Sequence, residues 1–210
     1  MTIGKLTRKI FKDKFYKIAK YYRKIFVDLD KVVCSIPNIN SYKNVLDIGG
    51  GDGEIINHFF KYNSETKVTL IDISDNAGMA IEPVYLKDVK ILKSTGIKNI
   101  QPITEKYDLI MINFVLHHIP ENERSVFFND LKYFIKYSTK VIITEVQKGH
   151  FISLLGFLCD YLISGDKNTK LINKEQVKNY LNQYFGNPNI EETNLYNANS
   201  PNYQIYMKIE

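Results

Sequence analysis

A glycine-rich turn joins two regular stretches of the chain. The turn, Gly49-Gly50-Gly51-Asp52-Gly53, follows the apolar run 44–48, which contains Asp47. It precedes residues 54–60, which have a helical pattern. Glycine lets a backbone approach a ligand closely and adopt positive φ angles. A turn that opens a helix also directs backbone N–H groups at whatever lies above the preceding strand. The pattern therefore predicts a small-molecule site at the end of a strand.

The spacing of these glycines argues against a nicotinamide or flavin site. Such a site needs Gly-x-Gly-x-x-Gly, and in the two possible registers the third glycine is replaced by Glu54 or by Ile56. A second acid, Asp72, lies at the end of the second predicted strand, within the run 68–73 and 19 residues after Gly53. An acid at the end of the second strand is placed to accept both hydroxyls of a ribose.

Two adjacent histidines could supply acid–base chemistry. His117 and His118 follow the apolar run 109–113, and either imidazole could act as a general base or serve only to order the loop. Glu145, at the end of the run 141–145, is a second candidate for the base. We find no group of side chains with metal-ligand spacing, and we expect no metal site.

These residues need a scaffold of alternating strands and helices. Strand, glycine turn, helix and strand over about 44–73 form a βαβ unit, whose right-handed crossover makes the two strands parallel. The elements predicted beyond it are strands at 89–92, 109–113, 141–145, 190–196 and 203–209, and helices at 121–136 and 173–185. We therefore expect an α/β, doubly wound Rossmann-like sheet, mostly parallel, with an antiparallel C-terminal edge hairpin.

Three blocks of this scaffold resemble the class I S-adenosylmethionine-dependent methyltransferases, in the branch that acts on small molecules. The blocks are residues 45–53 (VLDIGGGDG), 70–74 (LIDIS) and 107–120 (YDLIMINFVLHHIP). The resemblance covers residues 41–148 well and the remainder more loosely. It implies S-adenosylmethionine as cofactor, S-adenosylhomocysteine as product, and in-line displacement of a methyl group that the cofactor itself activates.

The resemblance also implies a role for individual residues. Gly49, Gly50 and Gly51 would contact the methionine portion of the cofactor, and Asp47 would hold the loop or the cofactor's amino group. Without a ligand, Asp47 could instead order the glycine turn. Asp72 would accept the ribose hydroxyls, although it could also cap the next helix.

The remaining contacts implied by the resemblance lie after the second, third and fourth strands. Ile73 would lie against adenine, while Asn113 and Phe114 would border the methionyl moiety and the sulfonium. The family often has an acid after strand three to receive the adenine amino group, and this chain has Thr95 there. A threonine hydroxyl can accept that hydrogen bond less strongly.

Composition restricts the class of protein. With 210 residues, 44% hydrophobic, the chain suits one globular domain. Two cysteines are too few for a disulfide framework, and the apolar runs are too short for a membrane span. No signal-peptide segment is recognisable at the N-terminus, so we expect a cytoplasmic protein.

The net charge of +5 is unevenly distributed. Residues 1–31 hold ten Lys and Arg against three acids, whereas the rest holds 18 against 20. Only three of the 28 basic residues are Arg, the residue favoured for reading bases and phosphates. Both observations argue against a nucleic-acid partner.

The basic N-terminus predicts an amphipathic helix over about 5–31, ended by Ser35-Ile36-Pro37. Its apolar stripe, which includes Phe11 and Phe15, could pack on the main domain, cap a substrate pocket or lie on a membrane surface. We divide the chain into this cap, 1–40, and a methyltransferase domain, 41–210. The apolar insert at about 149–170 would be an acceptor lid, a core helix or a homodimer contact.

Three functions remain open at this point. The first is methyl transfer to a small-molecule acceptor through an O-, N- or C-nucleophile, on a compound that is partly apolar or of glycan or lipid type. The second is an RNA or protein methyltransferase, although residues 113–116 lack the Asn/Asp-Pro-Pro-Tyr/Phe signature of many amino-group methylators. The third is a non-catalytic cofactor-binding or scaffold protein with the same fold.

Overall fold

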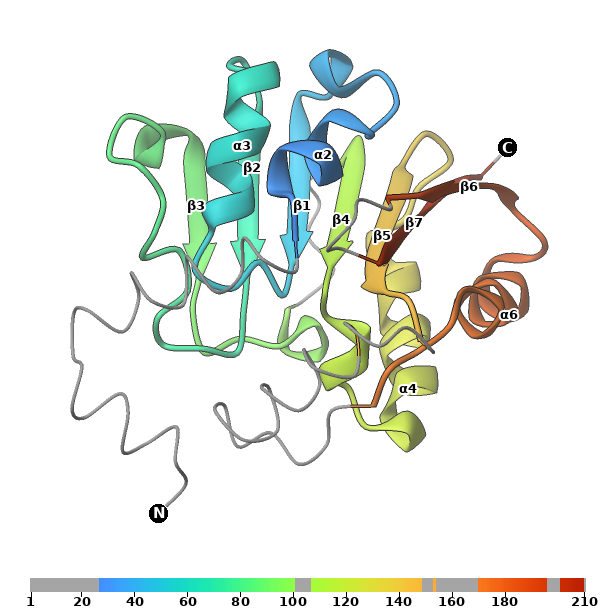
Figure 1. The fold of residues 1–210 in the computed structure, drawn as a ribbon. Coiled ribbons are helices and arrows are strands. Elements are labelled where there is room, and N and C mark those ends of the chain that lie inside the picture. Colours follow the sequence, from blue (N-terminus) through green and yellow to red (C-terminus); the bar gives the residue numbers. More distant parts are fainter. Residues whose placement is uncertain (1–26, 101–106, 149–152, 154–169, 196–200, 210) are drawn as a thin grey trace.

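The computed structural model of the chain describes residues 27–100, 107–148, 153, 170–195 and 201–209. The N-terminal helix predicted before residue 27 lies outside the described residues, as does the insert 149–169 apart from Ser153. Figure 1 shows the described elements arranged around one sheet.

Seven strands form this sheet in the order β3-β2-β1-β4-β5-β7-β6. The strands are β1 (Asn44–Ile48), β2 (Lys67–Ile71), β3 (Val89–Leu92), β4 (Leu109–Asn113), β5 (Lys140–Val146), β6 (Asn189–Asn194) and β7 (Asn202–Lys208). Neighbouring strands from β3 to β5 are parallel, whereas β7 is antiparallel to both β5 and β6. The predicted doubly wound sheet with an antiparallel edge hairpin is confirmed.

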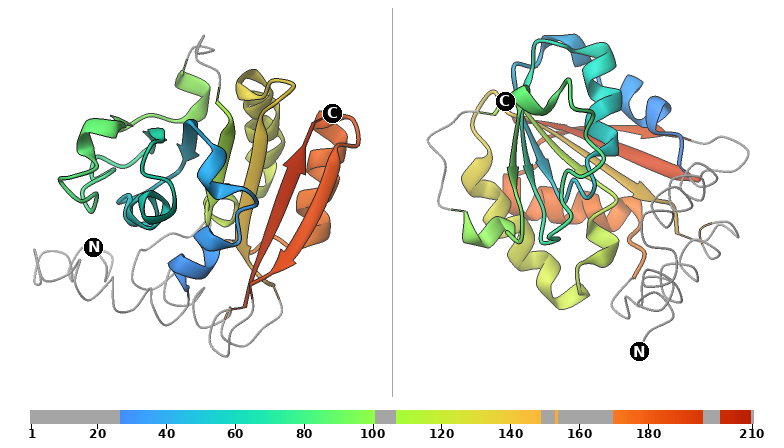
Figure 2. Two further views of the ribbon diagram at one scale, coloured as in Figure 1. Left: turned by 90° about the horizontal axis from the view of Figure 1, so that it is seen from above. Right: turned by 90° about the vertical axis from the view of Figure 1, so that its left-hand side faces the viewer.

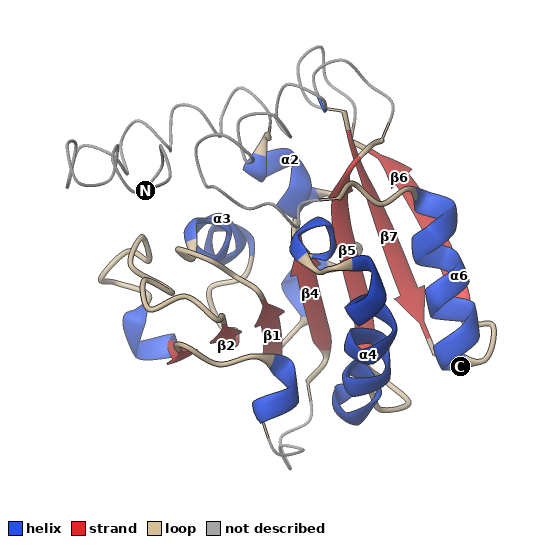
Figure 3. Ribbon diagram, turned by 90° about the horizontal axis from the view of Figure 1, so that it is seen from below, coloured by secondary structure: helices blue, strands red, loops and turns tan. Residues whose placement is uncertain are grey.

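Helices cover both faces of the sheet, as Figures 2 and 3 show. On one face lie α2 (Leu29–Cys34) and α3 (Glu54–Tyr62), and on the other lie α4 (Glu121–Leu131) and α6 (Lys174–Phe185). Short 3-10 helices connect them: η1 (Ile39–Ser41), η2 (Leu86–Asp88), η3 (Ile97–Asn99), η4 (Leu116–His118) and η5 (Lys132–Phe134).

Side chains of each strand alternate between two hydrophobic cores. In β4, Leu109 and Met111 pack with α2 and α3, while Ile110 and Ile112 pack with α4 and α6. Because both faces of the central strands are covered, these strands are apolar along their whole length. This explains why the short apolar runs of the sequence were recognisable as strands.

Two predicted helices differ from the structure in their extent. Within the described residues the N-terminal segment is not continuously helical, because Asp28 is extended and its side chain caps a new helix that begins at Leu29. That helix ends at Cys34, as the following Ser-Ile-Pro predicted. The helix predicted over 121–136 ends at Leu131 and continues as the 3-10 helix η5. In the described part of the chain, no helix is long and apolar enough to cross a membrane.

The start of α3 depends on Gly53, and this dependence is testable. Gly53 has φ +83°, and a Cβ there would lie 2.4 Å from Cγ1 of Ile81. Gly186, after α6, has a similar φ of +71° but open space around it. We expect Gly186→Ala to lower the free energy of unfolding by about 1 kcal/mol, and Gly53→Ala by about 2–4 kcal/mol, since overpacking adds to the strain. Urea denaturation measures both, and equal losses would contradict this account.

Candidate active site

The carboxyl ends of β1, β2 and β4 meet at one edge of the sheet, where the glycine turn crosses it. The turn is fixed to β2 by two hydrogen bonds. Gly49 N–H donates to the carbonyl of Ile71 at 2.7 Å, and Gly51 N–H donates to Oδ2 of Asp72 at 2.8 Å. This edge is where open α/β sheets bind their ligands.

Each glycine of the predicted site has its own reason to be glycine. Gly49 has φ +70°, and a Cβ there would lie 2.5 Å from Cγ2 of Val115. A Cβ on Gly50 would lie 2.4 Å from Oδ2 of Asp47. Gly51 has φ +55°, and a Cβ there would meet no atom within 4 Å. The turn is therefore packed closely on its inner side and open at Gly51, where a ligand can approach the backbone.

Asp47 is fully buried, and among the described residues neither of its carboxylate oxygens has a hydrogen-bond partner. Burial, and secondarily the negative charge of Asp72, raise the pKa of Asp47 to about 7. Buried carboxylates are ordinarily paired, because an unpaired one is strongly destabilising. This side chain is therefore suited to a ligand that brings a positive charge or hydrogen-bond donors to the glycine turn.

Asp72 directly follows β2 and contacts the glycine turn. Oδ2 of Asp72 accepts the Gly51 N–H, and Oδ1 accepts the N–H of Ser74 at 2.7 Å. A carboxylate oxygen can accept more than one hydrogen bond, so Asp72 remains able to receive ribose hydroxyls. Ile73 is 81% exposed, which is unusual for an isoleucine and suits a residue that an apolar ring would cover.

Thr95 is held close to Asp72, because its N–H donates to the Asp72 carbonyl at 2.9 Å. The Thr95 hydroxyl donates to the carbonyl of Lys93 at 2.6 Å. Its proton is thus occupied while its oxygen can still accept a hydrogen bond, as contact with an adenine amino group would require.

Asn113 and Phe114 end β4 in an unusual way. Asn113 is 9% exposed, and its side-chain amide nitrogen and oxygen have no hydrogen-bond partner in the part of the chain that the structure describes. Strand alternation places Asn113 and Asp47 on the same face of the sheet, the one covered by α2 and α3. Phe114 has φ +59°, a left-handed conformation that costs a non-glycine residue about 1 kcal/mol. Unpaired polar atoms and backbone strain therefore coincide at the predicted cofactor edge.

The structure brings His117 and Glu145 together. Nδ1 of His117 lies 2.6 Å from Oε2 of Glu145, and the other Glu145 oxygen accepts the N–H of Leu116 at 2.6 Å. Both side chains are buried, His117 at 4% and Glu145 at 0% exposure. His118 is exposed, and its ring lies 4.1 Å from that of His117. Both oxygens of the Glu145 carboxylate are thus bonded within the turn that contains Leu116 and His117.

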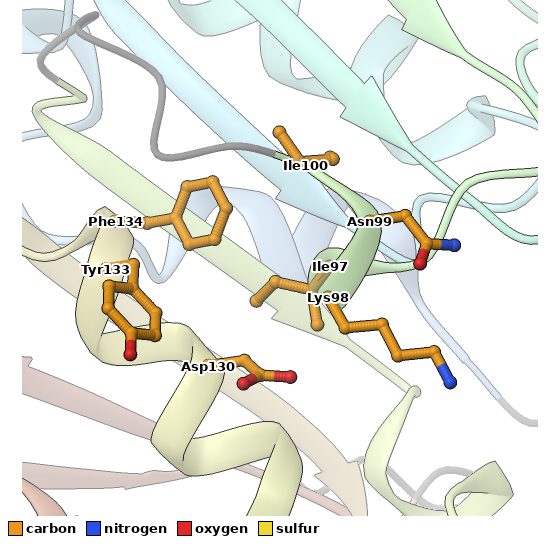
Figure 4. Close-up of a pocket in the computed structure, with 7 residues that line it drawn as sticks. All are labelled: Ile97, Lys98, Asn99, Ile100, Asp130, Tyr133 and Phe134. Carbon is orange, nitrogen blue, oxygen red and sulfur yellow. The ribbon is translucent and has the colours of Figure 1, made fainter.

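The described part of the chain holds no group of three or more His, Cys, Asp or Glu side chains that could bind a metal ion. One hollow of about 440 Å³ lies between η3 and the end of α4, next to Ile97, Ile100 and Phe134 (Figure 4). It contains none of the predicted site residues. Arg124 is buried beside residues 116–119, called here the histidine turn. It was not predicted as a site residue, because no motif near it in the sequence indicates a function.

The stability of the protein should depend on pH through Asp47. Its folded pKa lies above the unfolded value of 3.8, so folding binds a proton between about pH 4 and 7 and stability falls as pH rises through that range. Asp47→Asn removes this penalty. We expect the variant to be more stable than the parent at pH 8, by up to about 4 kcal/mol, and similar to it at pH 4. Thermal unfolding across this range measures the difference, and parallel curves would contradict the prediction.

Residues 46–133 match the family model of the methyltransferase domain. No curated protein sequence matches the chain significantly.

The chain is similar in structure to several solved methyltransferases. An O-methyltransferase family protein from Burkholderia thailandensis is 11% identical, with TM-score 0.69, over 87% of this chain and 55% of that one. Human N-acetylserotonin methyltransferase, in complex with S-adenosylmethionine, is 13% identical, with TM-score 0.68, over 86% and 51%. An S-adenosylmethionine-dependent methyltransferase from Archaeoglobus fulgidus is 18% identical, with TM-score 0.69, over 92% and 99%.

The chain thus spans about half the length of the first two proteins and nearly all of the third. At these identities the likeness establishes the fold alone. Residues 46–133 match a methyltransferase domain, and the sheet that contains them has the fold of these solved methyltransferases.

Proposed function

We propose that the protein transfers a methyl group from S-adenosylmethionine to a small-molecule acceptor. This proposal rests on the fully buried carboxylate of Asp47, which has no hydrogen-bond partner within the described ranges and lies against a glycine turn that is open at Gly51. The cofactor's ammonium group would supply the missing donors, and a positive charge there would favour the ionised form of Asp47.

The other predicted contacts fit the same cofactor. Asp72 would accept the ribose hydroxyls, Ile73 would cover one face of adenine, and the Thr95 oxygen would accept from the adenine amino group. Gly49, Gly50 and Gly51 would border the methionine portion, together with Asn113 and Phe114. S-adenosylmethionine supplies a methyl group on a sulfonium, and the protein's task is to bind it, align the acceptor and exclude water.

Of the two histidines, the geometry favours His117 as general base. A buried carboxylate that accepts the Nδ1 proton of an imidazole fixes its tautomer and favours the imidazolium formed when it takes a proton from the acceptor. In this proposal Glu145 is the orienting group, and His118 lies at the rim of the site. A base is needed when the acceptor is a hydroxyl or a protonated nitrogen.

The acceptor is proposed as a compound with an O-, N- or C-nucleophile, partly apolar or of glycan or lipid type. The segment 1–40 as a cap and the insert at about 149–170 as a lid remain predictions, since most of both lies outside the described residues. The described part of the cap includes α2, which buries Val32 and Val33 in the hydrophobic core between α3 and the sheet. Contact with a membrane surface through the N-terminal segment, a homodimer and a cytoplasmic location also remain predictions.

Two other functions compete with this proposal. An RNA or protein methyltransferase would bind the same cofactor, and gel-shift titration with RNA at two salt concentrations would detect it, because phosphate binding weakens with salt. A non-catalytic protein of the same fold would show no turnover with any acceptor.

Calorimetry with S-adenosylmethionine tests the cofactor site. We expect Asp72→Ala to weaken binding by about tenfold or more, because it removes a charged acceptor of hydrogen bonds and the anchor of the Gly51 N–H. Asp130→Ala, which changes an acid on α4 away from the turn, is the matched control and should bind like the parent. Absence of binding by the folded parent would refute the proposed function.

Release of S-adenosylhomocysteine tests the base. Small hydroxylated aromatic compounds, beginning with N-acetylserotonin, serve as probe acceptors because the human structural neighbour is named for that compound. With any acceptor that is turned over, we expect His117→Gln to lower kcat by about 100-fold or more while cofactor affinity is retained.

Variants of its neighbours make this test specific. Glu145→Gln should lower kcat less than His117→Gln, and His118→Ala should keep most of the activity. Loss of activity in His118→Ala with retention in His117→Gln would assign the base to His118 instead.

A further inference from the structure

The side chain of Arg124 is buried next to the histidine turn. Arg124, in the first half of α4, is 1% exposed. Its Nε donates to the carbonyl of Ile119 at 3.1 Å, and its Nη2 donates to the carbonyl of Lys170. Within the described residues its guanidinium bonds these two carbonyls and no carboxylate.

The two carbonyls belong to distant parts of the chain that meet at the site. Ile119 directly follows the histidines. Lys170 is the point at which the connection after β5 re-enters the described structure. The Lys170 N–H also donates to the carbonyl of His117 at 2.8 Å. Residue 170 is therefore joined to the histidine turn in two ways. Its N–H bonds the turn directly, and its carbonyl is linked to the turn through Arg124.

The choice of arginine is informative in this chain. Lysine occurs 25 times and arginine three times, yet arginine occupies the one buried position between these carbonyls. A guanidinium presents several N–H donors in a fixed plane, whereas an ammonium is a single point with a strong preference for hydration. A guanidinium is therefore the better group to hold two carbonyl oxygens at a fixed distance and direction from each other inside a core. A buried cation is also costly, which is consistent with a demanding geometric task.

The segment that follows Lys170 is also bonded to the sheet. The Tyr203 hydroxyl, on β7, donates to the carbonyl of Ile172 at 3.0 Å, so the re-entering segment is held from two directions. The side chain of Lys170 pairs with Glu121, but both are about half exposed, and this pair should contribute little.

We propose that Arg124 is a positioning residue for methyl transfer, which sets the orientation of the His117–Glu145 pair by holding the histidine turn to residue 170. This inference rests on the proposed function. Arg124 touches neither the glycine turn nor Asp72, so its contribution is to the acceptor side of the reaction and not to cofactor binding.

The test uses the full chain and the variant Arg124→Lys, which keeps the charge but cannot bridge both carbonyls. The control is Glu121→Gln, which removes the exposed ion pair with Lys170 and the weaker attraction of Glu121 to Arg124, but leaves both Arg124 hydrogen bonds in place. In ¹⁵N NMR spectra without cofactor, the parent and Glu121→Gln should show a low-field His117 Nδ1 proton and a protected Lys170 amide. Arg124→Lys should lose the first signal, and its Lys170 amide should exchange about tenfold faster or more.

The affinity for the cofactor distinguishes a positioning role of Arg124 from a general loss of structure in the variant. Affinity for S-adenosylmethionine should stay within about twofold of the parent in Arg124→Lys, while kcat with a productive probe acceptor falls about tenfold or more at unchanged KM for the cofactor. If Arg124→Lys keeps the His117 signal and the Lys170 protection, or loses cofactor affinity as strongly as turnover, the proposal is overturned. Absence of cofactor binding in the parent would instead refute the proposed function on which the proposal rests.

Chemical rescue covers the case in which Arg124→Lys is poorly folded. Arg124→Ala with millimolar ethylguanidinium should regain the His117 signal, while ethylammonium at the same concentration should not. Equal effects of the two ions, or none from either, would overturn the bridging role of the guanidinium.

Discussion

The carboxylate of Asp47 is buried in the core, and among the described residues it has no hydrogen-bond partner. Asp47 is the second-last residue of β1, and the glycine turn packs closely against it, since a Cβ on Gly50 would lie 2.4 Å from its Oδ2. Its pKa of about 7 reports the free energy stored in burying it. Burying a carboxylate without a partner is costly, and this unfavourable burial is the observation on which the proposed cofactor site rests.

The site has two sides that are built differently. On the side of β1 and β2, backbone N–H groups and Asp72 shape a loop of glycines, and Asp47 and Asn113 offer buried polar atoms that have no partner among the described residues. On the side of β5 and α4, the buried charged side chains are hydrogen-bonded: Glu145 with Leu116 and His117, and Arg124 with two carbonyls. The first side is prepared to gain a ligand, whereas the second holds a turn in one orientation. Both meet at the end of β4, where Phe114 adopts a strained conformation.

Much of this could be predicted from the sequence because the signals are local. A central strand covered on both faces must be apolar throughout, so the runs ending at Ile48, Ile71 and Asn113 were recognisable. The glycine turn and Asp72 were recognisable because close backbone approach and ribose recognition need those residue types at that spacing. Helix ends were less predictable: Asp28 caps a new helix although the apolar stripe continues across it, because capping depends on backbone conformation rather than on periodicity.

The sequence by itself determined the order of elements, the parallel core of the sheet and the identity of the residues at its carboxyl edge, since each follows from patterns within about thirty residues. Only the tertiary structure decided which of these residues touch. Glu145 was a candidate base in the sequence, but it lies 28 residues from His117, and only the pairing of β4 with β5 makes it that residue's hydrogen-bond partner. Arg124 and Lys170 are likewise brought together by packing across 46 residues, a separation over which no periodicity of the chain carries information.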